Sequence, residues 1–144
     1  MKDIESIYKL LNWENSREAQ EEGYRLAKEI NDLSLLIMPP APPSVWESCA
    51  KILSEKTDTE LEPYLDDIFK WLFDLNLPGA LIILDRLKIF SGKILKKYFE
   101  NRLINTPSQN KDEERIWLSF LDDLHDNEEL IAELPSSILE KLGY

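Results

Sequence analysis

Residues 61–90 read LEPYLDDIFKWLFDLNLPGALIILDRLKIF, and this stretch decides the fold class. Its first half carries apolar residues at steps of three and four, the period of an α-helix. These residues are Tyr64, Ile68, Trp71 or Leu72, and Leu75. Asn-Leu-Pro-Gly at 76–79 then breaks the pattern, and residues 80–90 are apolar almost all round, which is typical of a helix buried on most sides. The stretch therefore predicts two helices joined by a sharp turn.

Helix-start signals extend this pattern toward the N-terminus. A Ser, Thr, Asp or Asn side chain at a helix start accepts a hydrogen bond from a backbone amide, and a Glu three residues later completes a capping box. The candidate starts are Asp3 for a first helix, Asn15 or Ser16 for a second that runs to about Asp32, and the boxes Ser44-Val-Trp-Glu47 and Thr57-Asp-Thr-Glu60. The Ser44 box is the clearest of these signals.

Proline, glycine and polar residues fall between the periodic stretches. MPPAPP at 38–43 cannot continue a helix, because proline lacks an amide donor and constrains the residue before it. Ser91-Gly92 is a further break, residues 106–112 are the most loop-like stretch, and residues 127–142 predict one or two short helices punctuated by Pro135. We therefore expect a single all-α domain over 1–144, either a HEAT-like αα superhelix or a compact bundle of seven to nine helices.

Residues 44–90 also resemble an uncharacterised bacterial family of small HEAT-like helical proteins with a WLxDxNxP motif. The matching positions are Trp71, Leu72, Asp74, Asn76 and Pro78, whereas Leu77 stands where a second Trp is expected. The resemblance implies a HEAT-like fold. Members of this family look like proteins whose genes lie near toxin and immunity genes, so the resemblance implies an immunity function less firmly than it implies the fold. The Trp-Leu pairs at 71 and 117 lie 46 residues apart, within the period of about 40–47 residues of HEAT repeats.

The motif also has a structural interpretation that needs no ligand. Asn76 can cap the incoming helix, Pro78 suits a first helical turn, and Gly79 allows close packing. We expect these residues to serve the turn rather than to bind a ligand.

The net charge of −11 restricts the classes of partner and location. An excess of Asp and Glu disfavours nucleic acid and anionic membranes, which bind clustered positive charge. It favours a basic protein partner, although acidity can also serve solubility alone. The start, MKDIESIYKLL, has no secretion signal, and the longest apolar stretch, 77–84, is far shorter than the ~20 residues that span a bilayer. We therefore expect a cytoplasmic protein.

Few residues suit catalysis or metal binding. Cys49 is the single cysteine and lies on an apolar helical face, where a buried, inert thiol is expected. His125 is the single histidine, within an acidic run that lacks the spacing of an EF-hand loop. Four glycines cannot build nucleotide-binding loops. We expect no enzyme, no cofactor and no metal, and a hydrolase that uses the carboxylates around His125 remains the alternative from another class.

Two surfaces are candidates for partner binding. Asp67, Trp71 and Asp74 lie at i, i+4 and i+7, so one helix line would place an aromatic ring between two carboxylates. Asp122, Asp123 and Asp126 lie in residues 112–133, which hold nine acidic residues and one basic residue. Residues 86–102 hold six basic residues and one acidic residue. The alternatives are that Trp71 belongs to the core and that the two charged segments pair with each other.

The sequence thus favours a non-catalytic protein-binding module. The resemblance suggests an immunity-type protein that neutralises a basic toxin by covering it. The alternative is a helical-repeat scaffold or regulator unrelated to toxins.

Overall fold

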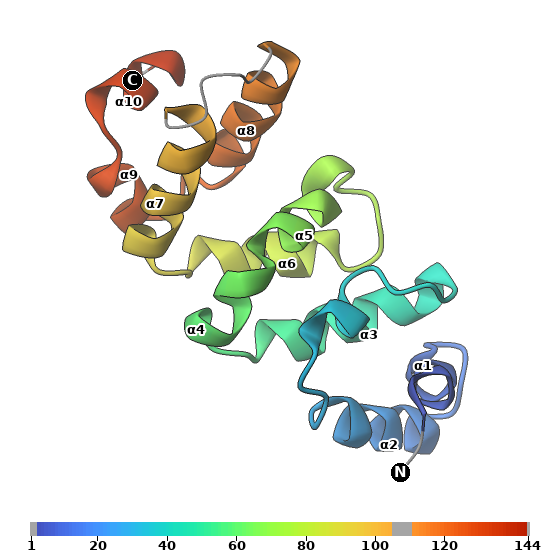
Figure 1. Ribbon diagram of the computed structural model, residues 1–144. Helices are drawn as coiled ribbons and strands as arrows, with labels where there is room; N and C mark the ends of the chain where they lie inside the picture. Colours follow the sequence, from blue (N-terminus) through green and yellow to red (C-terminus); the bar gives the residue numbers. More distant parts are fainter. Residues whose placement is uncertain (1–2, 105–110, 144) are drawn as a thin grey trace. The chain divides into compact units, whose positions relative to one another are not determined.

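Helices make up almost all of the regular structure. The computed structural model describes residues 3–104 and 111–143, and within these ranges it contains helices and turns but no strand (Figure 1). The all-α prediction is therefore confirmed. The loop predicted at 106–112 lies mostly outside the described residues, and its last two residues, Lys111 and Asp112, begin a helix instead.

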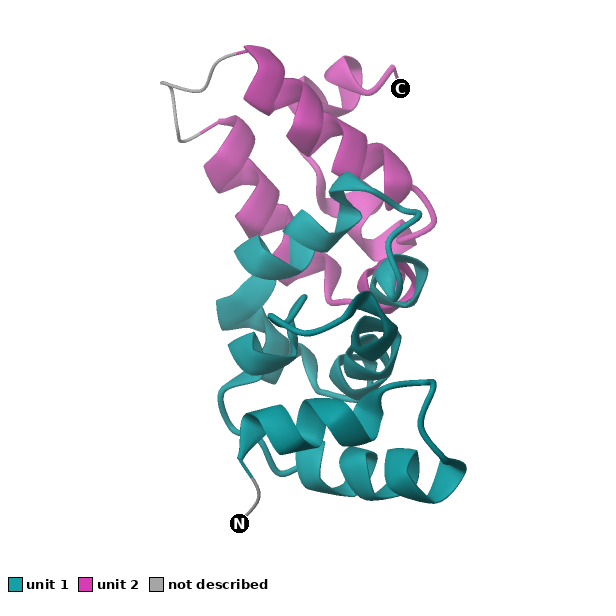
Figure 2. Ribbon diagram, turned by 90° about the vertical axis from the view of Figure 1, so that its right-hand side faces the viewer, with its two compact units in different colours: residues 1–83 teal, residues 84–144 magenta. Residues whose placement is uncertain are grey.

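The chain divides into two compact units, Met1–Ile83 and Leu84–Tyr144 (Figure 2). The first unit contains α1 (Ile4–Leu11), α2 (Arg17–Ala27), the 3₁₀ helix η1 (Leu33–Leu36), α3 (Pro43–Ser54), α4 (Asp58–Leu61), η2 (Glu62–Tyr64), α5 (Leu65–Lys70) and η3 (Trp71–Phe73). Helix α6 (Ala80–Lys88) crosses the boundary. The second unit contains α7 (Gly92–Leu103), α8 (Lys111–Asp123), α9 (Glu128–Glu133) and α10 (Ser136–Lys141). Because α4 and α5 belong to one unbroken helical stretch, the α-helices of the described residues agree with the predicted seven to nine.

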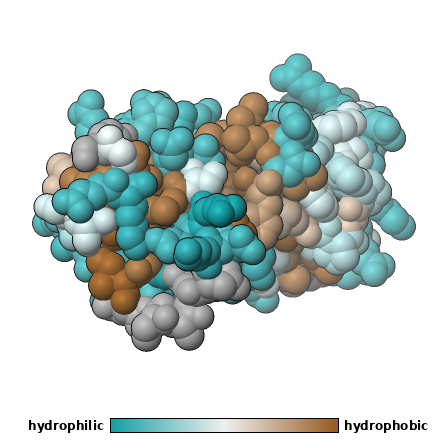
Figure 3. Space-filling view, turned by 90° about the horizontal axis from the view of Figure 1, so that it is seen from above, coloured by the Kyte–Doolittle hydropathy of each residue, from teal (hydrophilic) through white to brown (hydrophobic). Residues whose placement is uncertain are grey.

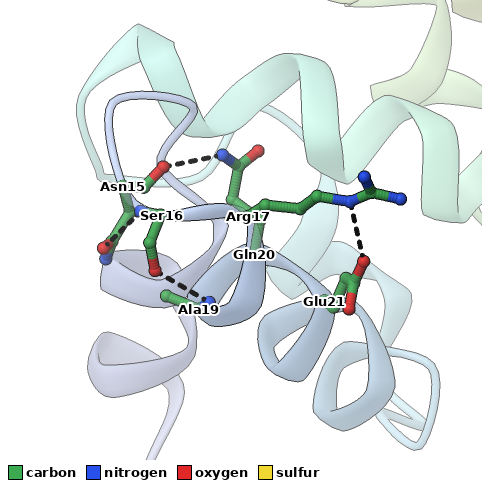
Figure 4. A network of polar contacts seen from close by, with 6 residues as sticks. All are labelled: Asn15, Ser16, Arg17, Ala19, Gln20 and Glu21. Atoms are coloured by element: carbon green, nitrogen blue, oxygen red, sulfur yellow. Dashed lines mark hydrogen bonds and ion pairs between the residues drawn. The ribbon is translucent and has the colours of Figure 1, made fainter.

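Several predicted caps are confirmed in the first unit. Asp3 Oδ1 accepts from Ser6 N at 2.8 Å, and Ser16 Oγ accepts from Ala19 N at 3.1 Å. Figure 4 shows the start of α2, where Asn15 supports Ser16 by accepting its amide at 2.8 Å. The capping box at 57–60 has both of its reciprocal hydrogen bonds. These side chains occupy amides that a helix start leaves without partners.

Two boundaries differ from the prediction. Helix α2 ends at Ala27 rather than near Asp32, because Asp32 starts a new element: its carboxylate accepts from Ser34 N at 3.1 Å and caps η1. Helix α3 begins at Pro43, with Pro42 in the capping position and no capping side chain. Proline needs no amide partner in a first turn, so Ser44 lies inside the helix and the Ser44 box is wrong.

The turn at 74–79 follows a different route from the predicted one. The chain leaves η3 in extended conformation at Asp74, whose Oδ1 accepts from Asn76 N at 2.9 Å. Helix α6 begins only at Ala80, so Asn76 does not cap it and Pro78 precedes its first turn. Gly79 has φ +86°, and a Cβ there would lie 2.8 Å from Ala50 Cβ. The predicted close packing at Gly79 is therefore confirmed.

Two tryptophans tie the proline-containing segments to the core of the first unit. Trp71 is fully buried, and its indole N–H donates to the Pro78 carbonyl at 2.9 Å. Trp46 packs edge-on against it, with ring centroids 6.2 Å apart, and donates to the Pro39 carbonyl at 3.0 Å. Buried indole N–H groups need an acceptor, and here each finds one seven residues before or after itself in the chain.

A buried amide organises the second unit. Asn127 is 3% exposed; its Oδ1 accepts from Leu130 N at 3.1 Å, and its Nδ2 donates to the carbonyls of Leu87 and Phe90, both at 3.0 Å. The side chain therefore caps α9 and also occupies carbonyls at the end of α6. Nearby, Gly92 at the start of α7 lies directly against the first turn of α9.

We predict that Gly92→Ala destabilises the protein by about 1–3 kcal/mol, as overpacking does. An added Cβ would lie 2.5 Å from the carbonyl carbon of Glu129, so backbone must move. The Gly92 amide also donates to Glu129 Oε1 at 3.0 Å, and this bond would be disturbed. Thermal unfolding followed by circular dichroism measures the effect. Lys93→Ala, an exposed change in the same helix, is the control, and equal melting temperatures for the two variants would contradict the prediction.

Candidate functional site

The candidate site is the acidic turn, residues 122–129 (DDLHDNEE), which joins α8 to α9. Two of its side chains point inward: Leu124 is fully buried and Asn127 nearly so. The exposed residues are Asp122, His125, Asp126, Glu128 and Glu129. Together with Leu130, the inward residues recur every three positions and anchor the turn, so the carboxylates between them are held facing solvent.

The exposed His125 side chain contacts two oxygens of its own turn. Its Nδ1 lies 2.9 Å from the Asp122 carbonyl oxygen, and its Nε2 lies 3.1 Å from Asp126 Oδ1. Both ring nitrogens therefore lie within hydrogen-bond distance of oxygens of the same turn. A general base needs an unprotonated nitrogen that faces a substrate, whereas both nitrogens of this ring face acceptors within its own turn.

Pairing between the basic and acidic segments is partial. Lys88 Nζ lies 3.6 Å from Asp126 Oδ2 and 3.9 Å from Asp85 Oδ1, so this lysine joins residues 86–102 to the acidic turn. Neither Asp122 nor Asp123 has an ion pair in the part of the chain that the structure describes. Intrachain pairing therefore reaches Asp126 but leaves Asp122 and Asp123 at the end of α8 without an ion pair in the described residues.

The carboxyl of Asp123 differs from its neighbours. It is half-buried at the last position of α8, and burial raises its pKa, with a further increase from the charge of Asp122. His125 and Lys88 act in the opposite direction. Of the three aspartates predicted to contact a partner here, Asp123 is therefore the least accessible, while Asp122 and Asp126 are exposed.

The other predicted surface does not form. Trp71 is 0% exposed, so its role as an exposed binding anchor is wrong, and the alternative of a core tryptophan is right. Asp67 and Asp74 are not on one helix line with it, because the helix tightens to 3₁₀ at Trp71 and ends at Phe73. Asp67 pairs with Lys70 at 3.3 Å, and Asp74 is exposed in the extended segment that follows.

Sequence reasoning did not assign Asn127 and Lys88 to the site. The signal for Asn127 was available, because an asparagine at the three-residue spacing of Leu124 and Leu130 occupies a core position. A buried amide must have partners, and at the start of a helix it can cap. Pairing between residues 86–102 and 112–133 was one of the alternatives, but the sequence does not indicate that Lys88 and Asp126, 38 positions apart, are the residues that pair.

The single cysteine lies outside the acidic turn, and the possible metal ligands are dispersed in the described residues. Cys49 is fully buried, and burial raises the pKa of its thiol to about 12, so the thiol is protonated at neutral pH. In residues 3–104 and 111–143, no group of three or more His, Cys, Asp or Glu side chains is arranged to hold a metal ion.

No protein family, curated protein or solved structure matches this chain. The resemblance of residues 44–90 to small HEAT-like proteins therefore stays a prediction. The two Trp-Leu pairs lie in unlike places, Trp71 in a 3₁₀ helix and Trp117 in the middle of α8. Among the described helices, none is long and apolar enough to cross a lipid bilayer.

We predict that Asp123→Asn raises the melting temperature at pH 7. A carboxyl whose pKa is raised by folding stabilises the folded state at low pH, and this contribution is lost as pH rises through the folded pKa. Asparagine avoids that loss, so the gain should shrink near pH 3, below the ordinary value of 3.8. Glu140→Gln, which neutralises an exposed carboxylate in the same unit, is the control. A gain that is unchanged at pH 3 would contradict the assignment.

We predict that His125→Ala leaves biological activity largely intact. The contacts of this side chain are exposed, so its loss should change the free energy of unfolding by less than about 1 kcal/mol. Circular dichroism tests folding, and the activity of the variant in cells tests function. Severe loss of activity in a folded variant would instead support the hydrolase that uses the carboxylates around His125.

Proposed function

We propose that the protein is a non-catalytic binding module whose acidic turn contacts a basic protein. The observation that carries this proposal is the fixed outward position of the carboxylates of Asp122, Asp126 and Glu128 on a turn anchored by Leu124 and Asn127. Charged groups that are already ordered lose little conformational entropy on binding, so more of the interaction energy appears as affinity.

The electrostatics favour fast association. A net charge of −11, concentrated in the acidic segment, attracts a basic partner before contact and raises the association rate. The effect falls with ionic strength, because the screening length is ~8 Å at physiological salt. Rim charges of this kind act mainly on the association rate, while buried anchors act on dissociation.

A finer proposal is that the partner is a basic toxin enzyme and that this chain is an immunity-type protein that covers it. Its support is the resemblance of residues 44–90 together with the acidic charge. The coarser proposal does not depend on it, because a scaffold or regulator could use the same surface.

We expect reversal of exposed charge in the acidic turn to slow association. Asp122→Lys with Glu128→Lys tests this, because Asp126 already pairs with Lys88 and Asp123 is half-buried. A partner is captured from the native cell, and stopped flow then gives its association and dissociation rates with this chain at several salt concentrations. The on-rate at low salt should fall about tenfold, with a small change in the off-rate.

The matched control reverses two exposed carboxylates of the first unit, Glu14→Lys with Glu62→Lys, for the same change in net charge. An equal loss in the control would mean that only net charge matters, and no loss in either variant would remove the acidic turn as the interface.

If the captured basic protein is lethal when expressed alone and harmless beside this chain, the immunity proposal is supported. A partner without toxicity contradicts that finer proposal only.

A further inference from the structure

The first unit carries an apolar groove where α1, α2 and η1 meet. In the described residues the large exposed apolar side chains are Trp13, Leu35, Phe73, Leu81, Ile89, Ile104 and Ile116. Figure 3 shows hydrophobic groups in brown among hydrophilic ones in teal on the face it draws. Leu35 lines a cavity of about 340 Å³ with Ile4, Ile7, Leu26, Ile30, Glu29, Asn31 and Asp32. Release of water from this apolar lining favours binding.

The apolar lining comes from one row on α1 and from the end of α2 with the turn that follows it. Ile4 and Ile7 are three residues apart on α1, whereas Leu26 lies in the last turn of α2 and Ile30 lies in the turn after it. Helices α1 and α2 pack against each other, and an i+3 row such as that of α1 is a surface against which a further helix packs. Leu35 closes one side.

The groove is held open by hydrogen bonds. Tyr8 Oη donates to the Leu35 carbonyl at 2.6 Å and fixes η1 against α1. Asp32 Oδ1 accepts from Ser34 N and Ser34 Oγ at 3.1 and 2.6 Å and fixes the start of η1. The groove is therefore pre-formed, which lowers the entropy lost on binding.

The charge along the groove selects the occupant. Its lining includes the carboxylates of Glu29 and Asp32 and no lysine or arginine. A second copy of this chain would bring the same carboxylates against themselves, which repel. An occupant with lysine or arginine beside its apolar side chains would pair with them.

We propose that this groove binds an amphipathic helix of a partner protein, with apolar residues at i, i+3, i+4 and i+7 and basic residues along one flank. The inference goes beyond the proposed function, because it concerns the first unit and does not require the acidic turn. The two are tested by variants in different units.

The test uses the full chain with labelled methyl groups and a synthetic 15-residue helix that has leucines at this spacing and lysines on one flank. We expect saturable shifts in the methyl signals of Ile4, Ile7, Leu26, Ile30 and Leu35. The same peptide with glutamates in place of the lysines should bind at least about tenfold more weakly. Shifts confined to other residues, or equal binding of the two peptides, would overturn the proposal.

Two variants test the groove residues. Leu35→Glu and Glu29→Lys should each weaken the peptide at least about tenfold, the first by placing a charge in the apolar lining and the second by repelling lysine. Their controls are Leu81→Glu, at an exposed apolar position, and Glu14→Lys, with the same charge change outside the groove. Sedimentation shows whether the chain is a monomer. Equal weakening in the controls would show that the peptide does not bind in this groove. A dimer that Leu35→Glu dissociates would show that a second copy of the chain occupies the groove instead.

Discussion

The structure depends on how its helix ends are satisfied. The described α-helices run from 4 to 13 residues, and every α-helix leaves four amides and four carbonyls without partners inside it. With helices this short, end groups make up a large share of the backbone amides and carbonyls, and side chains between helices supply part of their partners. Ser16, Thr57 and Asn127 cap amides at helix starts, and Asn127 also donates to the Leu87 carbonyl in the last turn of α6. The indoles of Trp46 and Trp71 donate to carbonyls of the segments between helices. No buried side-chain nitrogen or oxygen in the described residues lacks a hydrogen-bond partner.

The candidate interface arises from the same requirement. Asn127 ends α6 and starts α9 with one side chain, and this places the acidic turn in a single conformation. Because Leu124 and Asn127 face inward, His125 and Asp126 between them and Glu128 after them are exposed. The buried side chains of the turn, rather than contacts among the carboxylates, therefore determine that these carboxylates are exposed. The apolar groove has a similar origin, since the Asp32 cap and the Tyr8 hydroxyl position η1 against α1.

The sequence predicted those features of the fold that depend on residues a few positions apart. The apolar period identified the helices, and Asp3, Ser16 and Thr57 act through amides only three residues away. The failures have causes that lie further along the chain. Trp71 reads equally well as a surface or a core residue until the Pro78 carbonyl is seen to accept its indole N–H. The pairing of Lys88 with Asp126 likewise needs the tertiary fold, although the charge of both segments could be predicted.

The order in which these helices pack also bears on how fast the chain folds. Helix α1 packs on α2 and α3 packs on η1, which are neighbours in the sequence, and α7 packs on α8 and on α9, the next two helices. Closing such short loops costs little chain entropy, and chains dominated by local contacts cross their folding barrier in about microseconds to milliseconds. Helices that pack on their neighbours in the sequence expose their apolar faces only briefly after synthesis. The apolar faces of α1 and α2, which pack on each other, therefore spend little time available to aggregate.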